Sequence, residues 1–250
     1  MTTLTRAERR EIKRERRMKR TRYQSDTYEA VHVIQDYAPR KENFHTLEAQ
    51  TEAQAHYILS IDSNTVTFSI GPAGTGKTYV AVAKACEYLE SNKVDRIILT
   101  RPIQDAEEDK IGALPGTLEE KMDPYLAPVR QLLDRFLGKS KVEAYIKAGK
   151  IVGIPLGFMR GMTFDRAFIL ADEMQNSTPV TMKLLLTRIG KWSKVVIDGD
   201  VKQKDIRGTS GLEDAVNKLY GVKSINTVEF LKEDIVRSDI VRHILDRYES

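Results

Sequence analysis

The stretch Gly71-Pro72-Ala73-Gly74-Thr75-Gly76-Lys77-Thr78 has the spacing G-x-x-x-x-G-K-T. It follows an apolar run at residues 66–70 and precedes a helix-compatible segment at 79–90, which is the strand–loop–helix context of a phosphate-binding loop. Glycines let the backbone turn its N–H groups toward phosphate oxygens, and the helix amino terminus adds about half a positive charge. In such a loop Lys77 reaches the outer phosphates and the Thr78 hydroxyl holds Mg²⁺. A glycine-rich turn with a chance lysine is the alternative, and two later stretches argue against it.

Two carboxylates follow the apolar segment at residues 166–171. An aspartate at this strand end, Asp172, is expected to order the Mg²⁺ shell, and the adjacent Glu173 to accept a proton from an attacking water as a general base. A solvated strand end is the alternative, but the preceding residues are apolar enough to be buried. Further on, a strand at 194–198 leads into Gly199-Asp200-Val201-Lys202-Gln203, where Gln203 is expected to contact the γ-phosphate and its water.

Predicted strands and helices alternate along the chain, which favours an α/β fold: a three-layer α/β/α sandwich with a mostly parallel sheet covered on both faces. A glutamate beside the aspartate is typical of P-loop proteins that activate water directly. In that class the phosphate-loop strand lies next to the strand that ends at Gly199-Asp200. The expected strands are 66–70, 94–100, 150–155, 166–171, 194–198 and 224–228, the helices 47–61, 79–90, 124–137, 142–148, 178–189, 212–220 and 239–248, with a loop at 103–122.

Composition limits the class of protein. The chain has 250 residues, of which 41% are hydrophobic and 30% charged, enough for one sizeable core. No apolar run reaches the roughly 20 residues of a membrane helix, and the amino terminus lacks the apolar region of a secretory signal. With Cys86 as the single cysteine and the four histidines scattered, neither an intramolecular disulfide nor a histidine metal site is expected. These features favour a cytoplasmic location without a membrane partner.

The basic charge is concentrated at the amino terminus. Residues 1–22 carry ten Lys or Arg against three Glu, a net charge of +7, whereas the whole chain has +4. We therefore divide the chain into a basic amino-terminal extension and linker at 1–45 and a P-loop domain at 46–250. The extension is either an arm that binds nucleic acid in a salt-dependent way or a solubilising tail without a fold of its own.

Three polar side chains near the predicted loop edge are further candidates. Gln54 lies on the helix ahead of the phosphate-loop strand, where its amide can pair with an adenine edge or be an ordinary exposed side chain. Arg101 follows the strand at 94–100 at the edge where ligands collect in open α/β sheets, and a structural salt bridge is its alternative. Arg160 adds a basic group to the turn Phe158-Met159-Arg160-Gly161.

Taken together, these motifs resemble the PhoH family of P-loop ATPases, which is related to the cores of superfamily 1 helicases. The resemblance covers about residues 47–250 and excludes the basic extension. The length is similar to the compact members found in bacteriophages, and no KH or PIN nuclease module is recognisable. The matching stretches are Ile70 to Thr78, Leu99-Thr100-Arg101-Pro102, Leu118 to Leu126, Phe158-Met159-Arg160-Gly161, Asp172-Glu173-Met174-Gln175-Asn176, Leu186 to Gly190, Gly199 to Gln203 and Val241-Arg242-His243.

The resemblance implies a RecA-like fold that uses ATP and Mg²⁺. It also implies that Gln54 contacts adenine and that Arg101 and Arg160 contact RNA or a neighbouring subunit. Four positions depart from the family pattern, and two of these, Met162 and Lys204, fall where nucleic-acid or interface contacts are implied. The other two departures are Ser69 and Met174.

A chain of this size has room for one P-loop core, whereas superfamily 1 helicases bind ATP between two. An arginine supplied to the γ-phosphate increases the rate of hydrolysis by a factor of about 10³–10⁵. We therefore expect a homo-oligomeric ring, such as a hexamer, in which Arg188, Arg237 or Arg242 acts across the interface. Surface salt bridges are the alternative for at least two of these arginines.

Three functions compete at this point. The first is an Mg²⁺-dependent ATPase that couples hydrolysis to binding or unwinding of RNA or single-stranded DNA. The second is a nucleotide-regulated oligomeric interaction protein without motor activity. A small-molecule kinase is disfavoured, because Glu173 beside Asp172 suits water activation. Aromatic residues make up 7% of the chain and do not interleave with basic ones, so we expect contacts to the nucleic-acid backbone rather than base stacking.

Overall fold

A six-stranded sheet forms the centre of the domain, and all of its strand pairs are parallel. The computed structural model describes residues 47–102, 118–236 and 247. The strand order is β3-β2-β4-β5-β1-β6, so the phosphate-loop strand β1 lies directly beside β5, as the sequence predicts. The strands are β1 (Val66–Ile70), β2 (Arg96–Thr100), β3 (Ile151–Gly153), β4 (Ala167–Ala171), β5 (Lys194–Gly199) and β6 (Ile225–Glu229).

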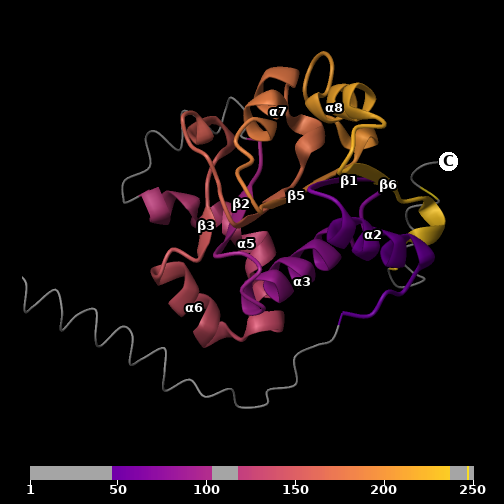
Figure 1. The fold of residues 1–250 in the computed structure, drawn as a ribbon. Helices are drawn as coiled ribbons and strands as arrows, with labels where there is room; N and C mark the ends of the chain where they lie inside the picture. The colour runs from indigo at the N-terminus through magenta and orange to yellow at the C-terminus, as the bar shows by residue number, and fades with distance from the viewer. Residues whose placement is uncertain (1–46, 103–117, 237–246, 248–250) are drawn as a thin grey trace, which may run out of the picture. The chain divides into compact units, whose positions relative to one another are not determined.

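Helices cover both faces of the sheet, which gives the predicted three-layer α/β/α arrangement. Figure 1 shows α2, α3, α5 and α6 on one face, with α7 and α8 on the other. The α-helices are α2 (Glu52–Ser63), α3 (Lys77–Glu90), α5 (Leu118–Leu137), α6 (Lys139–Lys147), α7 (Pro179–Leu186) and α8 (Gly211–Leu219). Four short 3₁₀ turns complete the described elements: η1 (Leu156–Met159), η2 (Met174–Asn176), η3 (Val201–Gln203) and η4 (Lys232–Asp234).

Strand β4 shows why the sequence folds into three layers. All five of its residues are buried, since a strand of a parallel sheet is covered on both faces. Phe168 and Leu170 pack into the core below α2, α3 and α5, whereas Ala167, Ile169 and Ala171 pack below α7 and α8. Full burial of a large apolar side chain contributes about 1.5–3 kcal/mol, so both cores hold the central strands in place beneath the site.

Several predicted boundaries are wrong, and helix α2 begins at Glu52 rather than at residue 47. The segment expected to be a loop at 103–122 already belongs to α5 from Leu118 onward, and the part at 103–117 lies outside the described residues. Helix α7 ends at Leu186 rather than at residue 189. Its end comes early because the Thr187 hydroxyl donates to the Lys183 carbonyl at 2.9 Å and Ile189 forms a parallel bridge with Phe164.

The predicted basic extension at 1–45 and most of the predicted helix at 239–248 also lie outside the described residues. Within the part of the chain that the structure describes, no helix has both the length and the apolar character needed to cross a membrane.

Candidate nucleotide site

The glycine-rich loop connects the end of β1 to the start of α3. Gly71, Gly74 and Gly76 have φ angles of 148°, 88° and 85°, a region that glycine adopts without steric cost. A Cβ on Gly71 would lie 2.3 Å from the Phe230 carbonyl oxygen, so this position also requires the absence of a side chain. Helix α3 starts at Lys77 with no side-chain cap. Its first N–H groups are therefore left to an anion, as in phosphate-binding loops.

Lys77 crosses this loop and fixes its curvature. Its Nζ donates to the carbonyl of Gly71 at 2.7 Å and to that of Pro72 at 2.9 Å. The Thr75 hydroxyl donates to the same Pro72 carbonyl at 3.0 Å. Burial lowers the pKa of the Lys77 amino group, while Asp198 and Asp200 oppose that shift by their negative charge. The loop thus holds a cation in reach of incoming phosphates.

Gln54 supports the phosphate loop from α2. Its side chain is 3% exposed; its Nε2 donates to the Thr75 carbonyl at 2.9 Å, and its Oε1 accepts from the Gln50 amide at 2.8 Å. The same Nε2 would lie 2.7 Å from a Cβ on Gly76. Gln54 therefore lies against the loop backbone rather than on an open helix face, and the adenine contact stays a prediction.

The two carboxylates at the end of β4 differ in their surroundings. Asp172 accepts a hydrogen bond from the Glu173 amide at 3.0 Å, yet burial, together with repulsion from Asp198 and Glu173, raises the pKa of its carboxyl to about 7. Glu173 is exposed and has a left-handed φ of 56°, a conformation that costs a non-glycine residue about 1–2 kcal/mol. Such strain at a carboxylate beside a phosphate loop is typical of functional sites.

Gln175 links this acidic tip to the neighbouring strand, which reasoning from the sequence did not single out as a site feature. Its Nε2 donates to Glu173 Oε2 at 2.6 Å, and its Oε1 accepts from the Asp200 amide at 3.1 Å. The side chain is 1% exposed. Gln175 thus orients the carboxylate of Glu173 and ties it to the Gly199-Asp200 segment. The only sequence signal was its place in the stretch Asp172 to Asn176.

A further carboxylate, Asp198, is buried on β5 and was also missed. It accepts hydrogen bonds at Oδ1 from the hydroxyls of Tyr57, at 2.7 Å, and Ser69. Its Oδ2 has no hydrogen-bond partner among the described residues. Burial raises the pKa of Asp198, and the two hydroxyls partly offset the shift. Ser69, a departure from the family pattern, therefore stabilises a charge next to the site.

These oxygen groups fit Mg²⁺, which prefers one or two protein oxygens together with phosphates and water. The Thr78 hydroxyl in the first turn of α3 and the Asp172 carboxylate are the groups that would hold it. Asp198 lies on β5, Asp172 directly follows the adjacent strand β4, and each has a raised pKa. A divalent cation would offset the negative charge that these carboxylates concentrate, and when bound it neutralises charge on the phosphates.

The remaining predicted residues lie around this centre or away from it. Gln203 is exposed on η3, directly after the Asp200 turn. Arg101 follows β2 and is half-buried, and Arg160 is exposed at the end of η1. Arg188 donates from Nη1 to the Met162 carbonyl at 3.1 Å, so it is held beside η1. The other two predicted arginines, Arg237 and Arg242, lie outside the described residues.

An all-parallel sheet with a glycine-rich loop after β1 and an acidic tip on the second strand away defines a RecA-like P-loop NTPase. A family model described as PhoH-like protein matches residues 46–249. The chain therefore belongs to the PhoH-like protein family, and membership implies nucleotide binding.

Several curated relatives carry the same description. The PhoH-like protein of Mycobacterium tuberculosis (strain H37Rv) is 47% identical over 205 residues, covering 81% of this chain and 58% of that protein. That of Bacillus subtilis (strain 168) is 43% identical over 206 residues, covering 82% and 64%. Protein PhoH of Escherichia coli (strain K12) is 43% identical over 204 residues, covering 80% and 57%. The chain thus spans less than two thirds of the length of these relatives.

Among solved structures, the chain is similar to the large terminase from a thermophilic bacteriophage. The TM-score is 0.47 at 11% sequence identity, and the match covers 79% of this chain and 50% of that one.

Proposed function

We propose that this protein is an Mg²⁺-dependent ATPase that couples ATP hydrolysis to the binding or unwinding of RNA or single-stranded DNA. The observation that carries the proposal is the contact of Gln175 with both Glu173 and the Asp200 amide. This contact connects the candidate base Glu173 to the segment that leads into Gln203. A structural change at the γ-phosphate would therefore be transmitted through Gln175 to the surface of the domain.

The geometry supports hydrolysis by water. The loop N–H groups and Lys77 bind and orient the phosphates, and Thr78 with Asp172 would hold Mg²⁺. Glu173 accepts the proton of the attacking water, and its carboxylate is held in one orientation by Gln175. Gln203, on η3, follows the same segment and contacts the γ-phosphate and its water. Positioning of this kind supplies most of the catalysis in phosphoryl transfer.

The coupling to nucleic acid is supported by charge and by connection. The extension at 1–22 has a net charge of +7, and each phosphate it neutralises would release counterions. Arg101, at the carboxyl end of β2, and Arg160, after β3, lie on loops at the strand ends that carry the nucleotide site. Both are candidates for contacts to a strand of nucleic acid or to a neighbouring subunit.

A second candidate function is a nucleotide-regulated oligomeric interaction protein. It is favoured by the position of Arg188, whose guanidinium donates to the Met162 carbonyl beside η1. An arginine for the γ-phosphate would then come from another subunit, from Arg188, Arg237 or Arg242 of a neighbour in a ring. In this reading hydrolysis times the recruitment of another factor.

The test is steady-state ATP hydrolysis over a range of protein concentrations, with and without single-stranded RNA and DNA. Stimulation by nucleic acid that is lost in Glu173→Gln supports the coupled ATPase. Upward curvature of the rate with protein concentration, removed by one of the three arginine-to-alanine variants, supports a shared site. Hydrolysis that ignores all nucleic acids favours the interaction protein, and no hydrolysis at all contradicts both.

A further inference from the structure

Basic side chains lie where the strands begin, at the amino-terminal edge of the sheet, opposite the phosphate loop. The four adjacent strands β3, β2, β4 and β5 each have a cation at their first residue or immediately before it: Lys150, Arg96, Arg166 and Lys194. Because the strands are parallel, these four starts share one edge. Neighbouring strands lie about 4.7–4.9 Å apart, so the four starts extend over about 14 Å. We call these four residues, with Lys191 and Trp192, the basic edge.

Trp192 stands at this edge, two residues before β5. It is the only tryptophan of the chain, its side chain is 74% exposed, and its φ is 56°. Lys191 beside it is also exposed. Tryptophan offers a large flat surface that normally gains stability from burial. An exposed ring next to Lys191, at an edge with further cations, therefore points to a ligand that has both flat groups and negative charge.

The loop that carries Trp192 is held firmly. The Arg166 amide donates to the Lys191 carbonyl at 2.9 Å, and the Lys191 amide donates to Asp165 Oδ1 at 2.6 Å. On the other side, the Ser193 hydroxyl donates to the Phe164 carbonyl at 2.7 Å. The backbone is thus fixed on both sides of the ring by contacts to the neighbouring loop. A ligand that binds it has little ordering entropy to overcome.

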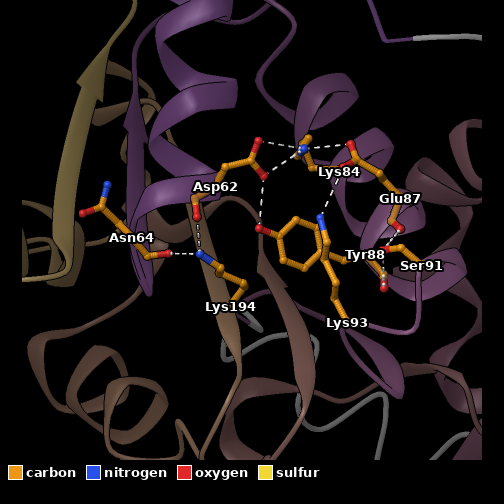
Figure 2. A network of polar contacts seen from close by, with 8 residues as sticks. All are labelled: Asp62, Asn64, Lys84, Glu87, Tyr88, Ser91, Lys93 and Lys194. Atoms are coloured by element: carbon orange, nitrogen blue, oxygen red, sulfur yellow. Dashed lines mark hydrogen bonds and ion pairs between the residues drawn. The ribbon is translucent and has the colours of Figure 1, made fainter.

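The local carboxylates compensate part of the positive charge. Figure 2 shows Asp62 and Glu87 around Lys84, which is buried and lies 2.9 Å and 2.7 Å from them. Lys194 donates to the carbonyls of Asp62 and Asn64 at 2.8 and 2.6 Å, and the negative charge of Asp62 also favours its protonated form, so its charge is partly compensated.

The other cations of the basic edge differ in whether a carboxylate pairs with them. Arg166 is paired with Asp95 at 3.0 Å. Lys150 lies 5.1 Å from the Tyr145 ring centroid, which is a cation–π contact and not an ion pair. For Arg96 and Lys191, no ion pair is found within the described part of the chain. The basic edge therefore carries five cations, Lys150, Arg96, Arg166, Lys191 and Lys194, against the carboxylates of Asp95 and Asp165 that contact it.

We infer that the basic edge binds a single-stranded nucleic acid, with a base stacked on Trp192 and the phosphates contacted by Arg96 and Lys191. This inference rests on the proposed function and adds a site to it. Unpaired bases stack on aromatic side chains irrespective of sequence, whereas the bases of a duplex are already stacked. An acidic peptide would satisfy the cations but not the ring. The sequence shows no interleaved aromatic and basic residues, because this site is assembled from the starts of four strands.

The site lies at the other end of the strands from the nucleotide. A strand of five residues, such as β4, is about 17 Å long at about 3.3 Å per residue. Nucleic acid and nucleotide therefore bind without competing for the same groups.

The first test is a fluorescence titration of the full chain with a short oligouridylate and a short oligothymidylate. Trp192 is the sole tryptophan, so its emission reports this site alone. We expect saturable quenching that weakens with salt, with a log–log slope of about −0.7 for each phosphate bound. A duplex of the same length and polyglutamate are the controls. Equal quenching by polyglutamate, or no quenching by either oligonucleotide, overturns the inference.

The second test uses variants and the anisotropy of a labelled oligonucleotide. Trp192→Ala is expected to weaken binding about 5- to 150-fold, the range for loss of one stacked base, and Trp192→Phe to retain most of it. Arg96→Ala and Lys191→Ala should each reduce the salt slope by about 0.7. Tyr220→Ala is the matched control, since Tyr220 is 90% exposed in the loop before β6. Unchanged affinity in Trp192→Ala refutes the site.

The two proposals fail separately. If nucleic acid stimulates ATP hydrolysis while Trp192 emission and Trp192→Ala affinity are unchanged, the coupled ATPase stands and the basic edge is refuted. If Trp192 is quenched and its variant binds weakly, but hydrolysis ignores nucleic acid, the basic edge stands and the coupling is refuted.

Discussion

Gln175 offers the sharpest test of how the acidic tip works. Its side chain donates to Glu173 at 2.6 Å and accepts from the Asp200 amide at 3.1 Å. Gln175→Met keeps the length and much of the volume of the side chain but removes both hydrogen bonds. If Gln175 acts by orienting Glu173, this variant should lose turnover while the phosphate loop, to which the described Gln175 side chain makes no hydrogen bond, still binds nucleotide.

The expected magnitudes follow from these two contacts. The Asp200 amide is left buried without a partner, which costs about 1–3 kcal/mol of unfolding free energy. A general base accelerates the reaction about 10²–10⁴-fold. In Gln175→Met the base Glu173 is present but misoriented, so only part of this acceleration should be lost, and we expect kcat to fall about 10–100-fold. Glu173→Gln removes the base itself, so kcat should fall by about 10²–10⁴ with little change in stability, because residue 173 is exposed.

The assay is a double-mutant cycle on kcat, with nucleotide affinity and urea unfolding measured for each protein. Glu173→Gln with Gln175→Met should be no slower than Glu173→Gln alone, since the positioning residue acts only through the base. Losses that multiply would show that Gln175 acts independently of Glu173. A Gln175→Met protein with unchanged kcat would contradict the orienting role.

Three other experiments test the phosphate loop, the buried carboxylate Asp198 and the core around Cys86. Gly71→Ala should abolish binding of a fluorescent ATP analogue, because its Cβ would meet the Phe230 carbonyl at 2.3 Å. Gly161→Ala, also at positive φ but with nothing within 4 Å, should retain binding and cost only about 1–2 kcal/mol in urea unfolding. Tyr57→Phe should cost about 1.5–3 kcal/mol near pH 8 and less near pH 5. Burial raises the pKa of the Asp198 carboxyl in the folded state, so its contribution to the free energy of unfolding is present at acid pH and is lost as the pH rises through that folded-state pKa. Removing the Tyr57 hydroxyl raises this pKa further, so the variant loses more stability near pH 8 than near pH 5. Equal losses at both pH values would contradict this explanation. Burial raises the pKa of Cys86 to about 12, so a thiol reagent near pH 8 should label it only as fast as the domain opens, and rapid labelling without urea would contradict its position in the core.

The local sequence was sufficient to predict the phosphate loop and the general α/β architecture. The loop at 71–78 is contiguous, and its glycines carry their conformational requirement in the residue type itself. The alternation of apolar strands with helices favours parallel pairing, and the glutamate beside Asp172 indicated the class of P-loop protein in which β1 lies next to β5, as observed. Boundaries were less predictable, because the end of α7 depends on a bridge between Ile189 and Phe164, which lie on different segments.

The sequence by itself determined that the chain has a nucleotide-binding loop, an acidic strand tip and a parallel sheet. Only the tertiary structure decided which side chains meet there: Tyr57 reaches Asp198 across a separation of 141 residues. Gln175 likewise reaches the Asp200 amide directly after strand β5, and the basic edge collects the starts of four strands. The physical reason is that strand order and register place these groups together, and both arise from the packing of two cores against the sheet rather than from any short stretch of residues.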